Sequence, residues 1–373
     1  MKLFITILLS VFVVQQASAS SLEVIDLAGR KVSIEAPVSK FVVSEGRYLT
    51  ALSILRPENP VQGVVGMMTT LGWTHPGLDK KLKAKFPETK EIPIFGSRSA
   101  DSVSVEKIID LKPEVAIFGL SDHGPNAKNH ELMKQLDAAG ITVVFIDFRL
   151  DPLNNTIPSL RLLGQILGEE EKAERYINHY EKRLAMVRER LDNIENRPTV
   201  FLQVHAGRRA CCWGMADGML GPFVEVAGGK NIADAVAPGP TALHTNEFLL
   251  DENPDVWIGT ASGTLGEFKL GNLPVAVGPG MTAEMAAQSL SSYLTADEFQ
   301  AMDAVRTSRA HSFWHNFYNS PFNIVVLEAF AKWIHPDRFQ DVDPQQSLID
   351  IYDQFMPFGV DGAYFTTYRH DAN

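Results

Sequence analysis

Residues 150–197 read LDPLNNTIPSLRLLGQILGEEEKAERYINHYEKRLAMVRERLDNIENR, and this stretch decides the fold. Apolar residues at helical spacing predict a short helix over residues 152–168, which Gly168 ends. A longer helix is predicted over residues 169–193, because no Pro or Gly interrupts them. One face of it carries apolar side chains at steps of three and four: Tyr176, Tyr180, Leu184, Val187, Leu191 and Ile194. At ~1.5 Å per residue, roughly 25 residues span ~37 Å, about the width of a small domain.

The patterns on either side of this helix are rich in strands, which favours a rigid rod joining two lobes. The alternative is a surface helix of one continuous domain. We therefore expect a first lobe over residues 20–150, a linking helical segment over 151–197 and a second lobe over 198–373. A mature chain of this length suits two domains.

The first 19 residues have the pattern of an export signal. Lys2 is followed by an apolar stretch over residues 3–14 and by the small residues Ala17, Ser18 and Ala19. The apolar stretch is short for a membrane span. We expect cleavage near Ala19 and a periplasmic protein.

Composition excludes several partners. The chain has 34 basic and 45 acidic residues, a net charge of -11, which argues against nucleic acid and anionic membranes. Its two cysteines, Cys211 and Cys212, are adjacent. They form either two free thiols or one strained ring, and the sequence leaves both open.

Signatures of catalysis are missing from the sequence. It contains no HExxH, GxSxG, Walker or CxxC motif. The ten His are dispersed, so no local spacing predicts a metal site. We expect no enzyme activity and no cofactor, with an exported metal-dependent hydrolase as the remaining enzymatic alternative.

In the first lobe, short apolar runs alternate with helical patterns, which predicts parallel strands with crossover helices. The runs lie at residues 41–43, 61–65, 115–118 and 142–146, with a further one at 92–95. Ligands bind beyond the carboxyl ends of such strands. The candidates are the residues just after each strand: Glu45, Arg47, Tyr48, Trp73, His75, Arg98, His123 and Arg149.

In the second lobe, the loop HAGRRACCWGMADG (residues 205–218) follows a predicted strand over residues 199–204. It carries His205, Arg208, Arg209 and Trp213. Planar guanidinium groups suit carboxylate, hydroxamate or catecholate oxygens, and an indole covers a flat ligand face. The loop is either a ligand wall or a basic surface hairpin with Trp213 as a lid. Another predicted strand, over residues 310–315, leads to Trp314, His315 and Tyr318.

Two stretches carry a resemblance to a known family: IPIFGSRSADSVSVEKIIDLKPEVAIF (residues 92–118) and GPFVEVAGGKNIADA (residues 221–235). They resemble the class III solute-binding proteins of ABC importers, which bind ferric siderophores, haem or vitamin B12. The resemblance implies an α/β fold of two Rossmann-like lobes with central parallel sheets, joined by one long rigid backbone helix. It also implies that Glu106 and Glu225 dock onto the permease, and that Arg98 and Trp314 contact the ligand.

The expected function is thus capture of a metal chelate, first of all a ferric siderophore, between the two lobes of a monomer, and delivery to an inner-membrane ABC permease dimer. Haem, vitamin B12 and a molybdate-like oxyanion are the alternative ligands. The predicted ligand-binding residues are Arg47, Tyr48, Trp73, Arg98, Arg149, His205, Arg208, Arg209, Trp213, Trp314, His315 and Tyr318.

Overall fold

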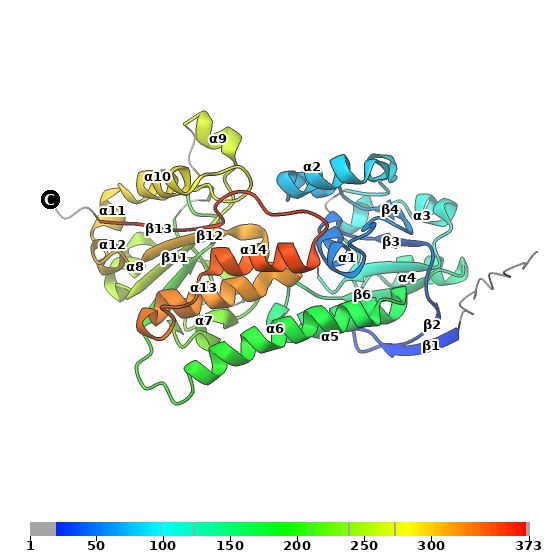
Figure 1. Cartoon of the computed structure of the whole chain (residues 1–373), viewed down its shortest axis with the longest axis horizontal. Helices are drawn as coiled ribbons and strands as arrows, with labels where there is room; N and C mark the ends of the chain where they lie inside the picture. Colours follow the sequence, from blue (N-terminus) through cyan, green and yellow to red (C-terminus); the bar gives the residue numbers. More distant parts are fainter. Residues whose placement is uncertain are drawn as a thin grey trace, which may run out of the picture.

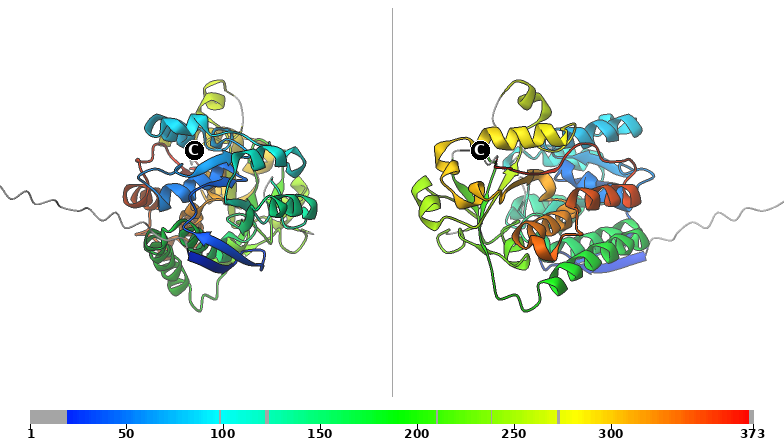
Figure 2. Two further views of the ribbon diagram at one scale, coloured as in Figure 1. Left: turned by 90° about the vertical axis from the view of Figure 1, so that its right-hand side faces the viewer. Right: turned by 60° about the vertical axis from the view of Figure 1, so that its left-hand side comes forward.

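The computed structural model describes residues 20–97, 99–121, 124–209, 211–237, 239–271 and 274–370, with the side chains of Ser20 and Trp73 left out. Two α/β lobes lie side by side, and helices α5 (Pro152–Leu167) and α6 (Glu170–Arg190) form one edge of the molecule (Figure 1, Figure 2). Among the described residues, no helix has both the length and the apolar character that a membrane span requires.

The first lobe contains a parallel sheet, as the alternating pattern predicts. Its strands run in the order β4-β3-β5-β6, and every neighbouring pair is parallel. Residues 92–95, predicted as a strand, form only an isolated bridge between Ile94 and Met67. The elements of this lobe are the hairpin β1 (Ser20–Ile25) and β2 (Lys31–Ala36), then β3 (Phe41–Val43), α1 (Leu49–Leu55), β4 (Val64–Met67), α2 (Pro76–Lys85), α3 (Val105–Leu111), β5 (Val115–Gly119), α4 (His130–Ala138) and β6 (Thr142–Ile146).

Helices α5 and α6 follow the predicted pattern. Gly168 takes the left-handed conformation (φ 69°) that ends α5. Helix α6 buries Tyr176, Tyr180, Leu184 and Val187, the face that the spacing predicts. It ends at Arg190, three residues before the expected end at Asn193, whose φ of 56° is not helical. Because α6 packs on both α1 and α13 (Ile324–Ile334), it contacts both lobes.

The sheet of the second lobe is mixed. Its order is β10-β8-β7-β11-β12-β13, with β9 beside β7. The neighbours β7, β9, β11 and β12 are parallel, whereas β8, β10 and β13 add antiparallel edges. The strands are β7 (Thr199–Gln203), β8 (Trp213–Met215), β9 (Lys230–Asn231), β10 (Thr241–Leu243), β11 (Val256–Ala261), β12 (Ala310–Trp314) and β13 (Phe365–Thr367). The remaining helices are α7 (Pro222–Val226), α8 (Asn246–Glu252), α9 (Leu265–Lys269), α10 (Ala283–Leu294), α11 (Asp297–Gln300), α12 (Asp303–Arg306) and α14 (Pro344–Phe355).

The C-terminal segment forms a second connection between the lobes. Helix α14 packs on both α13 and α1, and the chain then returns to pair β13 with β12 (Figure 1). On the way, Asp361 forms an ion pair with Lys81 of α2 at 2.6 Å, and Lys81 also donates to the Gly359 carbonyl. The sequence predicts one helix and an aromatic-rich tail over residues 343–368 but offers no functional account of this segment.

His311 of β12 is a buried neutral imidazole. Its ring stacks on Trp333 with centroids 4.7 Å apart, and its Nδ1 hydrogen-bonds Thr367 Oγ1 at 2.9 Å. Its Nε2 is buried without a hydrogen-bond partner. Burial lowers the pKa of His311 to about 3. The unfolded chain therefore binds a proton that the folded chain rejects, so stability falls as pH falls below the unfolded pKa of ~6.5.

We expect His311→Phe to flatten this pH dependence. Between pH 6 and 4 the slope of the unfolding free energy should decrease by about 1.4 kcal/mol per pH unit, as measured by urea unfolding. The same substitution at His130, which is exposed on α4, is the control and should leave the slope unchanged. An unchanged slope in His311→Phe would show that His311 does not titrate as described.

Candidate functional site

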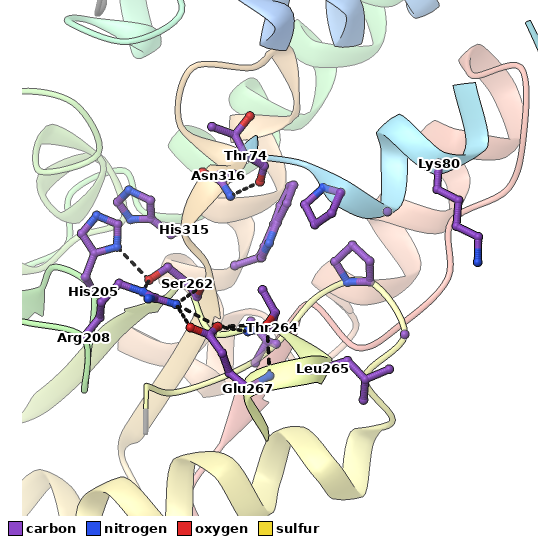
Figure 3. Close-up of a pocket in the computed structure, with 18 of the residues that line it drawn as sticks. Thr74, Lys80, His205, Arg208, Ser262, Thr264, Leu265, Glu267, His315 and Asn316 are labelled. Carbon is purple, nitrogen blue, oxygen red and sulfur yellow. Dashed lines mark hydrogen bonds and ion pairs between the residues drawn. The ribbon is translucent and has the colours of Figure 1, made fainter. Parts of the chain in front are cut away.

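Residues of both lobes line a cleft with two adjoining chambers. The larger chamber has a volume of about 800 Å³ and the smaller one about 300 Å³. Thr74, His205, His315 and Asn316 line both chambers and so form the junction between them. At the junction, Asn316 Nδ2 donates to the Thr74 carbonyl at 2.7 Å, which ties one lobe to the other (Figure 3).

The smaller chamber is rich in guanidinium groups. Arg47, Arg149 and Arg209 line it together with Tyr318. Arg47 and Arg149 lie over the Tyr318 ring at 5.2 and 6.0 Å, within the range of cation–π contacts. The short strand β3 and the carboxyl end of β6 place Arg47 and Arg149 here, as the rule for parallel sheets predicts.

Arg47 is already paired with a carboxylate. Its Nη2 lies 2.6 Å from Glu45 Oε1 and its Nε 2.9 Å from Glu45 Oε2. The two side chains are 1% and 5% exposed. Such a bidentate pair satisfies both charges without water, so Arg47 contributes shape and hydrogen-bonding capacity more than net charge.

Arg149 and Arg209 keep their charge. Arg149 donates through Nη1 to the Ser121 carbonyl, while its Nε is buried without a partner. Arg209 lies over the Trp213 ring at 5.4 Å. Neither has a carboxylate within ion-pair distance among the described residues. The smaller chamber therefore favours an anion.

Arg208 faces the larger chamber instead. It forms an ion pair with Glu267 (2.8 Å) and donates to the hydroxyl and carbonyl oxygens of Ser262 (Figure 3). Glu267 also completes a capping box with Thr264 at the start of α9. Glu267 therefore neutralises Arg208, and the sequence does not predict this partner.

Two neutral imidazoles stand at the junction. The rings of His205 and His315 lie 3.7 Å apart between centroids. Burial lowers the pKa of His205 to about 4, with Arg209 and Arg208 adding to the effect. Burial also lowers the pKa of His315 well below its ordinary value, and the neighbouring His205 and Arg47 lower it further. Both rings are therefore uncharged at neutral pH.

Each of these rings lies against a hydroxyl group. His205 Nδ1 lies 2.9 Å from Ser262 Oγ, and His315 Nδ1 lies 2.9 Å from Thr260 Oγ1. Ser262 Oγ accepts from Arg208, and Thr260 Oγ1 accepts from the His205 backbone N–H. Each hydroxyl can still donate its own proton to Nδ1 or accept a second hydrogen bond from Nδ1–H, so both ring tautomers satisfy the contact. Each neutral imidazole therefore offers one N–H donor and one nitrogen acceptor.

Trp314 and His75 meet between the lobes. Trp314 lines the larger chamber, and the His75 ring contacts it edge-on with centroids 4.6 Å apart. His75 is 1% exposed and neither ring nitrogen has a partner in hydrogen-bonding geometry. Burial and Arg47 lower its pKa, so His75 packs as a neutral ring.

The structure brings most of the predicted ligand-binding residues to the cleft. Those lining it are Arg47, Arg149, His205, Arg208, Arg209, Trp314, His315 and Tyr318. Tyr48 and Trp213 line neither chamber: Tyr48 is buried against Phe148, and Trp213 pairs with Leu243 in the sheet. Arg98, His123 and the side chain of Trp73 lie outside the described residues.

Sequence reasoning missed several lining residues, among them Thr74, Ser262, Glu267 and Asn316. Ser262 directly follows β11, so the rule that selects residues after strands would have found it. Among the described residues, no group of three or more His, Cys, Asp or Glu side chains could hold a metal ion. Cys211 and Cys212 form a disulfide in the loop that also carries Arg208 and Arg209.

Each predicted docking glutamate is exposed on its own lobe. Glu106 lies in the first turn of α3, where Ser104 caps the helix by accepting from the Lys107 N–H. Glu225 is the fourth of the five residues of α7, so it belongs to the first turn as well as to the last, and its side chain is exposed. In so short a helix the dipole does not account for this glutamate.

Comparisons with known proteins identify the family. A family model described as Periplasmic binding protein matches residues 62–310. The TroA-like periplasmic binding protein FepB from Veillonella parvula is 25% identical, with a TM-score of 0.81 over 93% of this chain and 99% of that one. The molybdate-binding protein MolA from Haemophilus influenzae, solved with molybdate, is 18% identical (TM-score 0.65; 91% and 99% covered). A periplasmic haem-binding protein from Pseudomonas aeruginosa is 16% identical (TM-score 0.53; 80% and 93% covered).

No curated protein matches the sequence. The family model spans more than half of the chain, and the chain belongs to the periplasmic binding protein family. It is a solute-binding protein of an ABC transporter with the two-lobed TroA-like fold, and its family consists of binding proteins, not enzymes.

Proposed function

We propose that the protein binds an anionic, oxygen-rich metal chelate of the ferric-siderophore class in the cleft and delivers it to an inner-membrane ABC permease dimer. The observation that carries this proposal is the smaller chamber, where three guanidinium groups and Tyr318 surround about 300 Å³. Glu45 neutralises one guanidinium, so Arg149 and Arg209 supply the net positive charge.

The neighbouring groups support the same ligand chemistry. The imidazoles of His205 and His315 are neutral, and in one of their two tautomers each has an Nε2–H donor for a carboxylate, hydroxamate or catecholate oxygen. A small oxyanion of the molybdate type would use the guanidinium groups but leave the larger chamber and its Trp314 wall without contacts. Vitamin B12 needs few cationic partners, so the charge of the chamber does not favour it.

We expect Arg149→Ala to weaken binding of a ferric catecholate. A charge-assisted hydrogen bond contributes about 1.5–3 kcal/mol, so the dissociation constant should rise about tenfold or more. Tryptophan fluorescence titration with the iron(III) complex of 2,3-dihydroxybenzoate measures this. Arg161→Ala is the control, because Arg161 pairs with Glu174 on the surface of α5 and lines neither chamber. Unchanged affinity in Arg149→Ala would remove Arg149 from the site.

Haem is the second candidate, and the imidazole pair is the observation that favours it. A haem iron needs an axial ligand such as an imidazole nitrogen. Nε2 of either ring can serve when the ring proton lies on Nδ1, where the hydroxyl partner can accept it in a hydrogen bond. A Soret shift on mixing with haemin, lost in a His205→Ala and His315→Ala double variant, would favour haem over the siderophore class.

A further inference from the structure

We infer that the ligand has two chemically distinct ends: an anionic chelating head that occupies the smaller chamber and an uncharged, apolar arm that occupies the larger one. This inference rests on the proposed function and adds the chemistry of the part of the ligand that does not bind the metal.

The larger chamber offers an arm mainly apolar surface. Pro76, Leu265, Val277, Pro279 and Trp314 line it. They come from both lobes, since Pro76 begins α2 and Leu265 begins α9. Burial of apolar ligand surface against such walls is favourable, at roughly 25 cal/mol per Å².

The charged groups of the larger chamber do not require a charged arm. Glu267 neutralises Arg208, and Lys81 neutralises Asp361. Lys80 is exposed, and Figure 3 shows its ammonium group directed away from the other labelled residues. Of the four charged residues that line this chamber, three are thus paired within the protein and Lys80 is exposed, whereas the smaller chamber holds Arg149 and Arg209.

The side chains at the junction indicate which chemical group joins the head of the ligand to its arm. Its side chains are the imidazoles of His205 and His315 and the carboxamide of Asn316, all uncharged. A neutral imidazole offers one donor and one acceptor nitrogen, which suits an uncharged polar group with both functions, such as an amide, between the two chambers. The cleft thus fits a chelating head joined by an amide to an apolar arm.

The size of the two chambers agrees with such a ligand. The larger chamber has more than twice the volume of the smaller one, about 800 against 300 Å³. Ligand pockets bury most of the surface of the molecules they bind. A compact chelate held by the three guanidinium groups would leave the larger chamber without a solute, so the arm accounts for that volume.

A pair of probes tests the inference directly. The iron(III) complexes of N-methyl- and N-octyl-2,3-dihydroxybenzamide share the metal, the catecholate head and the charge, and differ only in the arm. Calorimetric titration below the micellar concentration should show the octyl complex binding at least about tenfold more tightly, since each buried methylene contributes up to about fourfold. Equal affinity for the two complexes would overturn the inference while leaving the chelate proposal standing.

Two further outcomes are decisive. Binding of neither complex would contradict the proposed function and, with it, this inference. Iron-free octyl amide binding as tightly as its iron(III) complex would also overturn the inference, because the metal and the negative charge of the chelating head would then contribute nothing.

A matched pair of variants places the arm. Leu265→Asn changes a lining residue of the larger chamber, and Leu270→Asn changes a residue of the same short helix region that is 77% exposed. Leu265→Asn should lower affinity for the octyl complex toward that of the methyl complex, and Leu270→Asn should change neither. Circular dichroism and thermal unfolding verify that both variants fold. An octyl preference that survives Leu265→Asn in a folded protein would contradict the assignment of the arm to this chamber.

Discussion

Replacing Glu106 and Glu225 together by alanine is expected to abolish uptake of the cargo by cells while leaving ligand affinity unchanged. Both carboxylates are exposed, one on each lobe, and neither lines a chamber of the cleft. We propose that a basic residue on the permease surface pairs with each glutamate.

The test is radio-iron uptake by a strain that carries either the native protein or the double variant, together with the affinity of the purified proteins. Each single variant should reduce uptake, and the double variant should stop it. The matched control is the double variant Glu131→Ala and Glu247→Ala, which removes two exposed glutamates from the first turns of α4 and α8. Normal uptake by the Glu106 and Glu225 variant would show that the docking assignment is wrong.

The second large effect concerns stability. Arg183 of α6 lies 2.5 Å from Glu328 of α13, whose side chain has no exposed surface. Arg183 also donates to Ser347 of α14, so one guanidinium joins three helices. Removing one partner of a buried ion pair leaves the other unpaired and costs about 3–5 kcal/mol. We expect Arg183→Met, which keeps the apolar stem, to lower the free energy of unfolding by that amount.

The pH dependence of this loss has a definite sign. Burial raises the pKa of Glu328, and Arg183 opposes that rise. Without Arg183 the carboxyl group is more readily protonated, so the deficit of Arg183→Met should shrink as pH falls toward 4. Arg190→Met is the control: Arg190 pairs with Asp341 on the surface, side chains 32% and 67% exposed, and should cost at most ~1 kcal/mol. If both substitutions lowered the free energy of unfolding by a similarly small amount, the buried ion pair of Arg183 and Glu328 would not stabilise the protein as described.

Much of the fold follows from local sequence signals. The predicted bounds of β3 and β6 agree with the structure, because short apolar runs define these strands. The apolar face of α6 and the left-handed conformation of Gly168 also follow from local sequence signals. Residues 92–95 show where local signals fail. This apolar run, predicted as a strand, forms only one isolated bridge, because strand pairing also depends on the neighbouring segment, which the run itself does not determine.

The candidate site could be predicted where residues lie at the carboxyl end of a strand or shortly after it. Arg47, Arg149 and His205 reach the cleft for that reason. The net charge of the site could not be predicted in full, because Arg208 pairs with Glu267, a residue that follows a different strand. The antiparallel edge strand β13 and the ion pair of Asp361 with Lys81 join segments far apart in the chain, and no local pattern encodes such contacts.

Native mass spectrometry of the purified protein after exposure to spent culture medium tests the central claim most directly. We expect a single added mass that contains iron, that leaves on reduction and chelation of the metal, and that the Arg149→Ala variant retains poorly. A protein that emerges with the mass of the polypeptide alone, or with a solute that contains no metal, would contradict the claim that this cleft binds a metal chelate.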